Sequence, residues 1–598
     1  MLQLTAENQV QTWLARFGAA LEARDVAGTT ALFAQEAYWR DLVCFTWSIV
    51  THEGRDEIQA MLAERLGDTA PSSIAFEPGT ARETDGGGAE AWFRFETALL
   101  RGRGHIRLVD GLCRTLLTSA IELKGHEEKA GPRRPRGVEH GAERDRPTWM
   151  DLRRREEEAL GTTEQPYCVI IGGGQGGLAL AARLKRLGVP ALVVDSLARP
   201  GDAWRRRYRS LCLHDPIWAC HMPYMPFPDH WPVYISKDRM GDWLEMYADA
   251  MDLHIWSSTT AKGAAYDPVA QEWTVEVERE GRPVTLRPKQ LVLATGMSGA
   301  PSVPSFPGAE DFRGEQCHSS AFRSGEAWAG KKCVVVGSNN SAHDICADLW
   351  EHGAEVTMLQ RSTTLVARAE TLFRFIVGKL FSEDALAAGI TTEQADYTAA
   401  SRPFAMLAEL HKPLYREIRR HDAEFYARLE KAGFMLDFGE DESGLSLKYL
   451  RRASGYYIDV GASELVASGQ IALRSGVQVA RLLPDGLELS DGSKLEADLI
   501  VYATGYDPME SWIAQLISPE VAERVGHVWG LGSGTRRDPG PWAGELRNMW
   551  KPTRQEGLWL QGGNLQQVRF YSRFLALQLQ ARMLGLDVEP RDPRGLAR

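Results

Sequence analysis

The stretch that decides the fold is YCVIIGGGQGGLALAARLKRLG, residues 167–188. An apolar run leads into Gly172, Gly174 and Gly177, spaced as GxGxxG, and a run rich in Ala and Leu follows. In a Rossmann-type unit the first glycine permits the tight turn, the second lets a pyrophosphate approach the backbone, and the third lets the helix pack closely on the strand. The helix N-terminus adds free N–H groups that favour phosphate. This stretch therefore predicts a dinucleotide-binding unit.

The next predicted strand, ALVVD, ends at an acid. Asp195 lies 23 positions after Gly172 (195 minus 172), near the spacing expected for a ribose-binding carboxylate. A glycine turn with an incidental acid is the alternative interpretation. The order of strand, turn, helix, strand and acid favours ribose binding.

A second stretch, KKCVVVGSNNSAHDICADLWEHGAEVTMLQRS, residues 331–362, repeats the pattern with Gly337, Asn339 and Ala342 in the three positions. Its second strand ends at Arg361, 24 positions after Gly337 (361 minus 337). A guanidinium there suits a 2′-phosphate, which a carboxylate would repel. An ordinary surface arginine at a strand end is the alternative. We predict NADPH rather than NADH at this second unit.

Two apolar strands end in Ala-Thr-Gly, at 294–296 and at 503–505, each late in its own nucleotide unit. Small residues let the backbone pass close to a bound cofactor, although a plain strand-to-loop turn explains one such tripeptide equally well. The pair favours two cofactor contacts.

The whole chain is that of an ordinary multi-domain enzyme. Its 598 residues favour three to four domains, and 44% hydrophobic with 25% charged residues is globular usage. A net charge of −11 argues against a nucleic-acid partner, and no stretch is long and apolar enough to act as a signal or cross a membrane, so we expect a cytoplasmic protein. The eight cysteines form no CxxC pair and no metal-ligand spacing, so we predict no metal site.

Residues 6–123 read as a helix followed by alternating strands, which predicts a small α+β domain. This order and the string ALFAQEAYWRDL, residues 31–42, resemble the cone-shaped SnoaL-like fold related to nuclear transport factors. Asp41, His105 and Asp110 are candidates to line a cone-shaped pocket. We favour a scaffold or dimerisation role, because fold analogy does not establish an active site, and a homodimer stays open.

A third motif lies between the two nucleotide units. Phe312, Gly314, His318 and Phe322 follow the pattern FxGxxxHxxxF, which resembles the fingerprint of class B flavin-containing monooxygenases. The segment GDAWRRRY, residues 201–208, resembles the Gly-x-Trp segment that this family places near the flavin.

Residues 208–248 are similar to the plant YUCCA-type, auxin-producing members of the family. The resemblance as a whole covers roughly residues 166–586. It leaves out the N-terminal domain.

The resemblance implies an α/β flavoprotein with two Rossmann-type domains, one for FAD and one for NADP, preceded by the small α+β SnoaL-like domain. The predicted divisions are 1–130 for the SnoaL-like domain, 131–163 for a charged linker and helix, 164–325 for the first part of the FAD-binding domain, 326–505 for the NADP-binding domain with a helical insertion, and 506–598 for the second part of the FAD-binding domain.

The resemblance also implies a reaction: NADPH reduces FAD, O2 adds to the reduced flavin, and a C4a-(hydro)peroxyflavin transfers one oxygen atom to a small organic substrate. Candidate outcomes are N- or S-oxygenation, as in N,N-dimethylaniline monooxygenases, or oxidation of a 2-oxo acid. The alternatives are a Baeyer-Villiger reaction on a ketone, less favoured because Phe322 replaces the usual tryptophan, and an NADPH-dependent flavin reductase without oxygenation.

His214 and Arg361 are the predicted catalytic residues. Many relatives place an asparagine where LCLHDP places His214, and a structural histidine is the alternative there; His318 is expected to be structural. Asn564, in QGGNLQQ, is predicted to approach the flavin, and a mere turn is the alternative. The predicted cofactor-binding residues are Gly172, Gly174, Gln175, Gly176, Gly177, Asp195, Gly201, Trp204, Arg205, His214, Ala294, Thr295, Gly296, Gly337, Ser338, Asn339, Asn340, Ser341, Arg361, Ala503, Thr504, Gly505 and Asn564.

Overall fold

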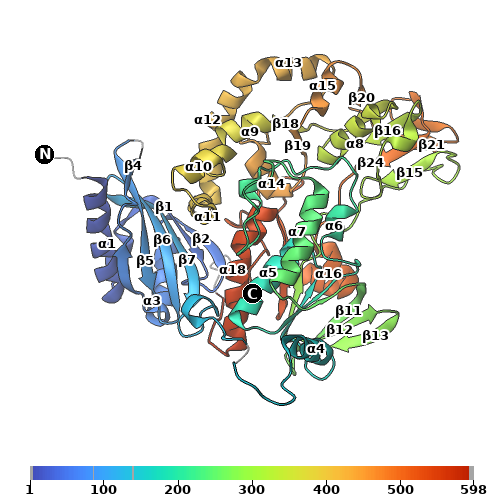
Figure 1. The fold of residues 1–598 in the computed structure, drawn as a ribbon. Helices are drawn as coiled ribbons and strands as arrows, with labels where there is room; N and C mark the ends of the chain where they lie inside the picture. The colour runs from blue at the N-terminus through green and yellow to red at the C-terminus, as the bar shows by residue number, and fades with distance from the viewer. Residues whose placement is uncertain (1–4, 85, 138–139, 591–598) are drawn as a thin grey trace.

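A computed structural model describes residues 5–84, 86–137 and 140–590. The N-terminal domain, blue in Figure 1, is a seven-stranded sheet covered on one face by helices. Its main strand order is β2-β1-β7-β6-β5-β3, with β4 paired to β5 and with β1 and β7 parallel. The elements are α1 (Ala6–Glu22), α2 (Val26–Thr30), β1 (Phe33–Leu42), β2 (Ile49–Glu53), α3 (Gly54–Thr69), β3 (Ser72–Phe76), β4 (Arg82–Thr84), β5 (Gly88–Glu96), β6 (Leu100–Val109) and β7 (Leu112–Leu123).

Aromatic rings fill the space between this sheet and its helices. A Cβ at Gly102 or Gly104 would fall within 2.3 and 2.1 Å of the rings of Phe95 and Phe93, so both glycines are needed where the rings cross β6. Trp39 stacks on Phe33 at 5.6 Å in the same layer. Such close packing makes this face of the sheet a solid core.

The three residues proposed for a pocket in this domain do not converge. Asp41 is buried and accepts hydrogen bonds from Thr46 and Thr118, His105 packs on Trp92, and Asp110 is exposed in the turn between β6 and β7. These candidates therefore do not line one pocket: Asp41 pairs with Thr118, which lies opposite Gly104, so the neighbouring His105 faces the other side of the sheet, and Asp110 lies beyond the end of β6.

A connecting segment leads from β7 to the first nucleotide unit. It contains the short turn η1 (Gly131–Arg133) and the helix α4 (Trp149–Ala159). Thr148 and Asp151 cap this helix reciprocally, and the helix lies within the predicted segment 131–163.

The first nucleotide unit is a parallel five-stranded sheet in the order β10-β9-β8-β14-β25, with α18 packed beside α5. All four residues of β8 are buried, as expected for a parallel strand covered on both faces. Its elements are β8 (Cys168–Ile171), α5 (Gln175–Leu187), β9 (Ala191–Val194), α6 (Asp202–Arg205), η2 (Ile217–Ala219), α7 (Lys237–Ala250), β10 (Ile255–Trp256), the meander β11 (Thr259–Asp267), β12 (Glu272–Arg279) and β13 (Arg282–Leu286), then β14 (Gln290–Leu293), β25 (Leu558–Leu560) and α18 (Leu565–Met583).

The second unit lies in the sequence between β14 and β25, so the chain leaves the first unit and returns to it. It repeats the design with a parallel sheet in the order β15-β24-β16-β17-β20. Its elements are β15 (Glu315–His318), η3 (Glu326–Trp328), β16 (Lys332–Val336), α8 (Asn340–Glu351), β17 (Glu355–Gln360), β20 (Ala472–Ser475), the meander β21 (Val479–Leu483), β22 (Gly486–Leu489) and β23 (Lys494–Glu496), and β24 (Leu499–Tyr502).

A helical insertion separates β17 from β20 and reaches the N-terminal domain (Figure 1). Within it, Ala400 accepts a hydrogen bond from Arg40 at 2.8 Å, and Tyr397 meets Trp92 edge-on. Its elements are β18 (Leu365–Arg368), α9 (Ala369–Phe375), η4 (Val377–Lys379), α10 (Glu383–Ala387), α11 (Thr392–Ala400), α12 (Phe404–His421), α13 (Ala423–Lys431), α14 (Leu445–Arg452), β19 (Tyr456–Asp459) and α15 (Ala462–Ala467); α16 (Glu510–Leu516) and α17 (Pro519–Val525) follow β24.

Two kinds of feature are absent from the described residues. No helix among them is long and apolar enough to cross a membrane, and no group of three His, Cys, Asp or Glu side chains among them is placed to hold a metal ion.

Candidate functional site

The two glycine turns open into one cavity of about 1380 Å³. The loops that follow β8, β14, β16 and β24 all contribute to its lining, so the cavity lies at the carboxyl ends of both parallel sheets. Ligands of open α/β sheets bind at this edge, where the strands end and the helix N-termini begin.

The first turn is built so that only one of its glycines faces open space. Gly172 has φ +115°, and a Cβ there would lie 2.4 Å from the carbonyl oxygen of Ala294. A Cβ on Gly177 would lie 1.9 Å from the carbonyl oxygen of Gly172. At Gly174 a Cβ would meet no protein atom within 4 Å. The first and third glycines therefore serve packing within the protein, and the second leaves room for a ligand.

The second turn solves the same packing problem with fewer glycines. Gly337 has φ +139°, and a Cβ there would lie 2.4 Å from the carbonyl oxygen of Ala503. Asn339 is extended at φ −99°, ψ −167°, a conformation open to any residue. The two Ala-Thr-Gly tripeptides thus hold equivalent places, each passing directly against the first glycine of its turn.

Asp195 is tied into the first turn. Its two carboxylate oxygens accept backbone hydrogen bonds from Gly173 at 2.5 Å and from Leu197 at 2.7 Å. Burial is the largest influence on this group and raises the pKa of Asp195 above its ordinary value. The side chain lines the cavity, so it orients the turn at the place predicted for a ribose.

Arg361 lies at the end of β17, exposed and lining the cavity. Among the described residues it makes no hydrogen bond or ion pair. A guanidinium without a protein partner at this edge suits an anionic ligand.

Most of the predicted cofactor-binding residues line the cavity, and three do not. Gly177 lies behind the turn, and Gly201 packs so tightly on α7 that a Cβ would fall 2.1 Å from the carbonyl oxygen of Gly241. Arg205 forms ion pairs with Asp202, Asp242 and Glu245. Gly177 thus makes the close approach of helix to strand predicted for the third glycine, whereas Gly201 and Arg205 join α6 to α7; a contact of these three with the cofactor is not seen in the cavity lining.

Trp204 and Gln175 do line the cavity, and the Trp204 indole N–H donates to Gln175 Oε1 at 3.2 Å. Asn564 lines it as well, but its side-chain oxygen accepts from the Gln567 backbone N–H at 2.9 Å. Asn564 is the N-cap of α18, so its amide is committed first to starting that helix.

A polar cluster joins the two units inside the cavity. The Tyr208 hydroxyl, from the first unit, donates to Asp344 Oδ2, from α8 of the second, at 2.7 Å. Burial raises the pKa of Asp344, while Tyr208, His214 and Arg207 oppose the rise. All four side chains line the cavity. Tyr208 and Asp344 were not among the residues predicted from the sequence. Their positions could have indicated them, because Tyr208 ends the GDAWRRRY segment and Asp344 lies in the first turns of the second nucleotide helix.

His318 lies at the same junction and ties the fingerprint to the second Ala-Thr-Gly. Its Nε2 is 3.0 Å from the carbonyl oxygen of Gly505 and its Nδ1 is 2.9 Å from the Ser320 hydroxyl. Both ring nitrogens are thereby engaged within the protein.

The cavity has polar atoms that no described residue satisfies. Thr295 Oγ1, Gln561 Oε1 and Trp512 Nε1 are buried without a hydrogen-bond partner, and all three residues line it. A buried polar group left unpaired costs stability, so such atoms indicate a polar ligand. Together with the open side of Gly174, the Thr295 and Gln561 oxygens fit a flavin dinucleotide along the first turn.

The comparisons with known proteins agree with this geometry. Residues 169–378 match the family model described as pyridine nucleotide-disulphide oxidoreductase. The chain is similar to indole-3-pyruvate monooxygenase YUCCA1 of Oryza sativa subsp. japonica, with 33% identity over 58% of this chain and 79% of the relative. It is also similar to probable indole-3-pyruvate monooxygenase YUCCA3 of Arabidopsis thaliana, with 31% identity over 58% of this chain and 74% of the relative.

Among solved structures, an ε-caprolactone-bound cyclohexanone monooxygenase shares the fold, with a TM-score of 0.50 and 19% identity over 70% of this chain and 88% of that one. With two Rossmann-type units, a shared cavity and the YUCCA relatives, the chain belongs to the class B flavin-containing monooxygenases, a family that uses FAD and NADPH.

Proposed function

We propose that this chain oxidises a 2-oxo acid with an aromatic side chain, using NADPH and O2. The observation that carries the proposal is the single cavity shared by the two glycine turns, because one cavity lets a hydride donor, the flavin and a substrate meet. The relatives named as indole-3-pyruvate monooxygenases act on such a 2-oxo acid and support this substrate class.

The 2-oxo acid, O2, NADPH and a proton give a carboxylic acid shorter by one carbon, CO2, water and NADP⁺. The bond between the carboxyl and carbonyl carbons breaks, one oxygen atom of O2 enters the new acid, and the other leaves as water. Bound FAD supplies the electron relay between NADPH and O2.

The chain's own residues bind, orient and exclude water. The Gly172 turn and Asp195 would hold FAD, and the Gly337 turn and Arg361 would hold NADPH. Arg207 lines the cavity, donates to the Tyr506 hydroxyl at 2.6 Å and has no carboxylate partner among the described residues, which suits it to a substrate carboxylate.

His214, Tyr208 and Asp344 are our candidates for moving protons at the junction. Tyr208 donates to Asp344 Oδ2 at 2.7 Å and burial raises the pKa of Asp344, so the pair places a proton donor and an acceptor at the junction. His214 is kept as the group nearest to the flavin by its place in LCLHDP.

We propose a non-catalytic role for the N-terminal domain and retain its assignment to the SnoaL-like fold. Its ring-filled core supports a scaffold, because the face of the sheet that could enclose a ligand is occupied by side chains.

The test is a substrate panel under 18O2 with the full-length, FAD-loaded protein. With indole-3-pyruvate or phenylpyruvate we expect NADPH consumption to match CO2 release, with one 18O atom in the product acid by mass spectrometry. A sulfide, a tertiary amine and a cyclic ketone complete the panel. If the sulfoxide or N-oxide forms and no acid does, the substrate is a sulfide or amine and not a 2-oxo acid. An ester from the ketone would support Baeyer-Villiger chemistry. NADPH oxidation that ends entirely in H2O2 with every compound would contradict a monooxygenase.

A further inference from the structure

Three arginines from three different segments line the cavity on the side of the second nucleotide unit. Arg361 directly follows β17, Arg452 ends α14 in the helical insertion, and Arg537 comes from residues 526–551, here named the cavity loop. Like Arg361, Arg537 makes no hydrogen bond or ion pair with a described residue. Burial, followed by repulsion from Arg452 and Arg361, lowers the pKa of Arg537 from its ordinary value. Arg361 and Arg537 are cations without a partner among the described residues, and Arg452 lies close enough to repel Arg537, so the three indicate a site for a multiply charged anion.

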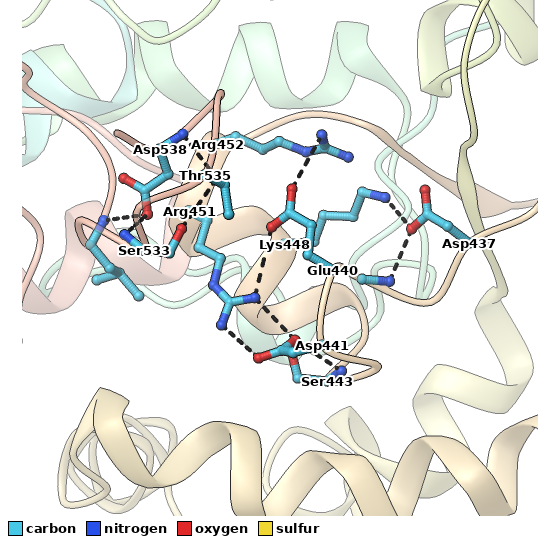
Figure 2. A network of polar contacts seen from close by, with 12 residues as sticks. Asp437, Glu440, Asp441, Ser443, Lys448, Arg451, Arg452, Ser533, Thr535 and Asp538 are labelled. Atoms are coloured by element: carbon cyan, nitrogen blue, oxygen red, sulfur yellow. Dashed lines mark hydrogen bonds and ion pairs between the residues drawn. The ribbon is translucent and has the colours of Figure 1, made fainter. Parts of the chain in front are cut away.

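Acidic residues of the insertion hold α14, and the cavity loop packs against it (Figure 2). Arg451 donates twice to Asp441, at 3.0 and 2.7 Å, and Arg452 lies 3.8 Å from Glu440. The Trp529 indole N–H of the cavity loop donates to the carbonyl oxygen of Tyr449 at 2.9 Å. The end of α14 and the cavity loop therefore form one structure.

The cavity loop is also braced from inside. Asp538, next to Arg537, is buried and accepts backbone hydrogen bonds from Gly532 at 3.0 Å and Ser533 at 2.9 Å, and Arg547 pairs with it at 3.0 Å. Because Asp538 is fixed on both sides, the placement of Arg537 depends on how the whole loop is held.

The N-terminal domain holds the other half of that loop. Arg40 on β1 donates from Nε and Nη2 to the two carboxylate oxygens of Glu545, each at 2.7 Å, with only 1% and 2% of the two side chains exposed. Thr51 on β2 donates to the same carboxylate at 2.6 Å, and the Trp542 indole N–H donates to Glu53 at 2.6 Å. A buried, bidentate pair of this kind fixes geometry more than it adds stability.

We propose that the N-terminal domain is part of the NADPH site: through Glu545 and Trp542 it fixes the cavity loop, so that Arg537 joins Arg361 and Arg452 around the 2′-phosphate. A phosphomonoester carries close to two negative charges at neutral pH and three acceptor oxygens, which matches a set of guanidinium groups. The inference rests on the NADPH dependence of the family and not on the proposed substrate.

Binding is measured on the full-length, FAD-loaded protein by calorimetry, with adenosine 2′,5′-bisphosphate as the probe and 5′-AMP as its partner without the 2′-phosphate. We expect Arg537→Ala to lower the affinity for the bisphosphate about tenfold, the loss expected for one charge-assisted hydrogen bond, and to leave the affinity for 5′-AMP unchanged. Arg536→Ala is the matched control, because Arg536 is adjacent and exposed but does not line the cavity.

The role of the N-terminal domain is tested by Trp542→Phe and Glu545→Gln, each alone and combined with Arg537→Ala. Alone, each is expected to weaken the bisphosphate about threefold. In the Arg537→Ala background neither should weaken it further, because residues that act through the same group are not additive. If Trp542 and Glu545 had a purely structural role, their variants would instead weaken the binding of both ligands, and this loss would also be seen in the Arg537→Ala background.

Several results would overturn the proposal: an unchanged bisphosphate affinity in Arg537→Ala, equal losses for both ligands, or additive losses in the double variants. Flavin content and the unfolding temperature identify any variant that fails to fold, and Trp542→Phe, which removes one hydrogen bond only, carries the test if Glu545→Gln does not fold. Since the readout is binding, failure of the proposed oxygenation would leave it intact.

Discussion

The two glycine turns share their backbone geometry but differ wherever a side chain faces the nucleotide. Gly172 and Gly337 both have positive φ and both lie against the backbone of an Ala-Thr-Gly tripeptide. The second position is Gly174 in one turn and Asn339 in the other, and this position lacks close protein contacts at Gly174. The packing of strand, turn and helix therefore dictates the first position, whereas the ligand side is free to vary with the nucleotide.

The largest effects are expected where both turns agree. Gly172→Ala and Gly337→Ala each place a Cβ 2.4 Å from a carbonyl oxygen at a φ that L-residues avoid, which costs about 1–3 kcal/mol in backbone strain before the clash is counted. We expect Gly172→Ala to purify without FAD, and Gly337→Ala to keep FAD but lose its reduction by NADPH. Flavin absorbance and stopped-flow reduction measure both.

The comparison would break if the two variants behaved alike. If NADPH reduced the flavin of Gly337→Ala at the wild-type rate, the second turn would not be part of the NADPH site. Gly330→Ala is a suitable control in the second unit, because Gly330 also has positive φ but a Cβ there meets no atom within 4 Å.

The next effect concerns the two strand ends. Arg361→Ala removes an unpartnered guanidinium and is expected to raise the KM for NADPH about tenfold or more while leaving the KM for NADH unchanged, since only NADPH has the 2′-phosphate. Arg361→Lys keeps the charge but lacks the planar guanidinium, so its KM for NADPH should lie between those of the wild type and Arg361→Ala. Initial rates with both nucleotides decide. An equal rise for NADH would place Arg361 outside the 2′-phosphate site.

The sequence predicts the features that local pattern controls. The strand, turn and helix around Gly172 follow from apolar runs and glycine spacing, and the capped start of α4 follows from Thr148 and Asp151. The roles of Gly201 and Arg205 could not be predicted, because each depends on where α7 packs, at residues some 40 positions away. The contact of Arg40 with Glu545 spans 505 positions, and no periodicity or motif indicates it.

A smaller effect is expected for Asp195. In the wild-type protein the two carboxylate oxygens of Asp195 each accept one backbone hydrogen bond, from Gly173 and from Leu197. Asp195→Asn keeps only one of these two acceptor oxygens. The amide also offers one acceptor oxygen fewer to the predicted ribose hydroxyls; losing one such hydrogen bond to FAD costs about 1 kcal/mol, so FAD affinity should fall about fivefold. Fluorescence titration of the flavin-free protein with FAD measures this. Unchanged affinity would mean that the second carboxylate oxygen contributes nothing to FAD binding.

The smallest effect is expected where the turns differ most in sequence. Asn339→Gly gives the second turn the glycine of the first, and since Asn339 is already extended, with only a 3.5 Å contact from its side-chain oxygen to Thr364, NADP⁺ affinity should change less than about threefold. Gly174→Ala, by contrast, should leave the flavin-free protein as stable as before and weaken FAD, because its Cβ would point at open space that the cofactor needs. A tenfold loss of NADP⁺ binding in Asn339→Gly would mean that the asparagine side chain itself contacts the nucleotide. The second turn would then be a distinct motif with its own ligand contact, and its missing glycine would be a requirement of NADPH binding.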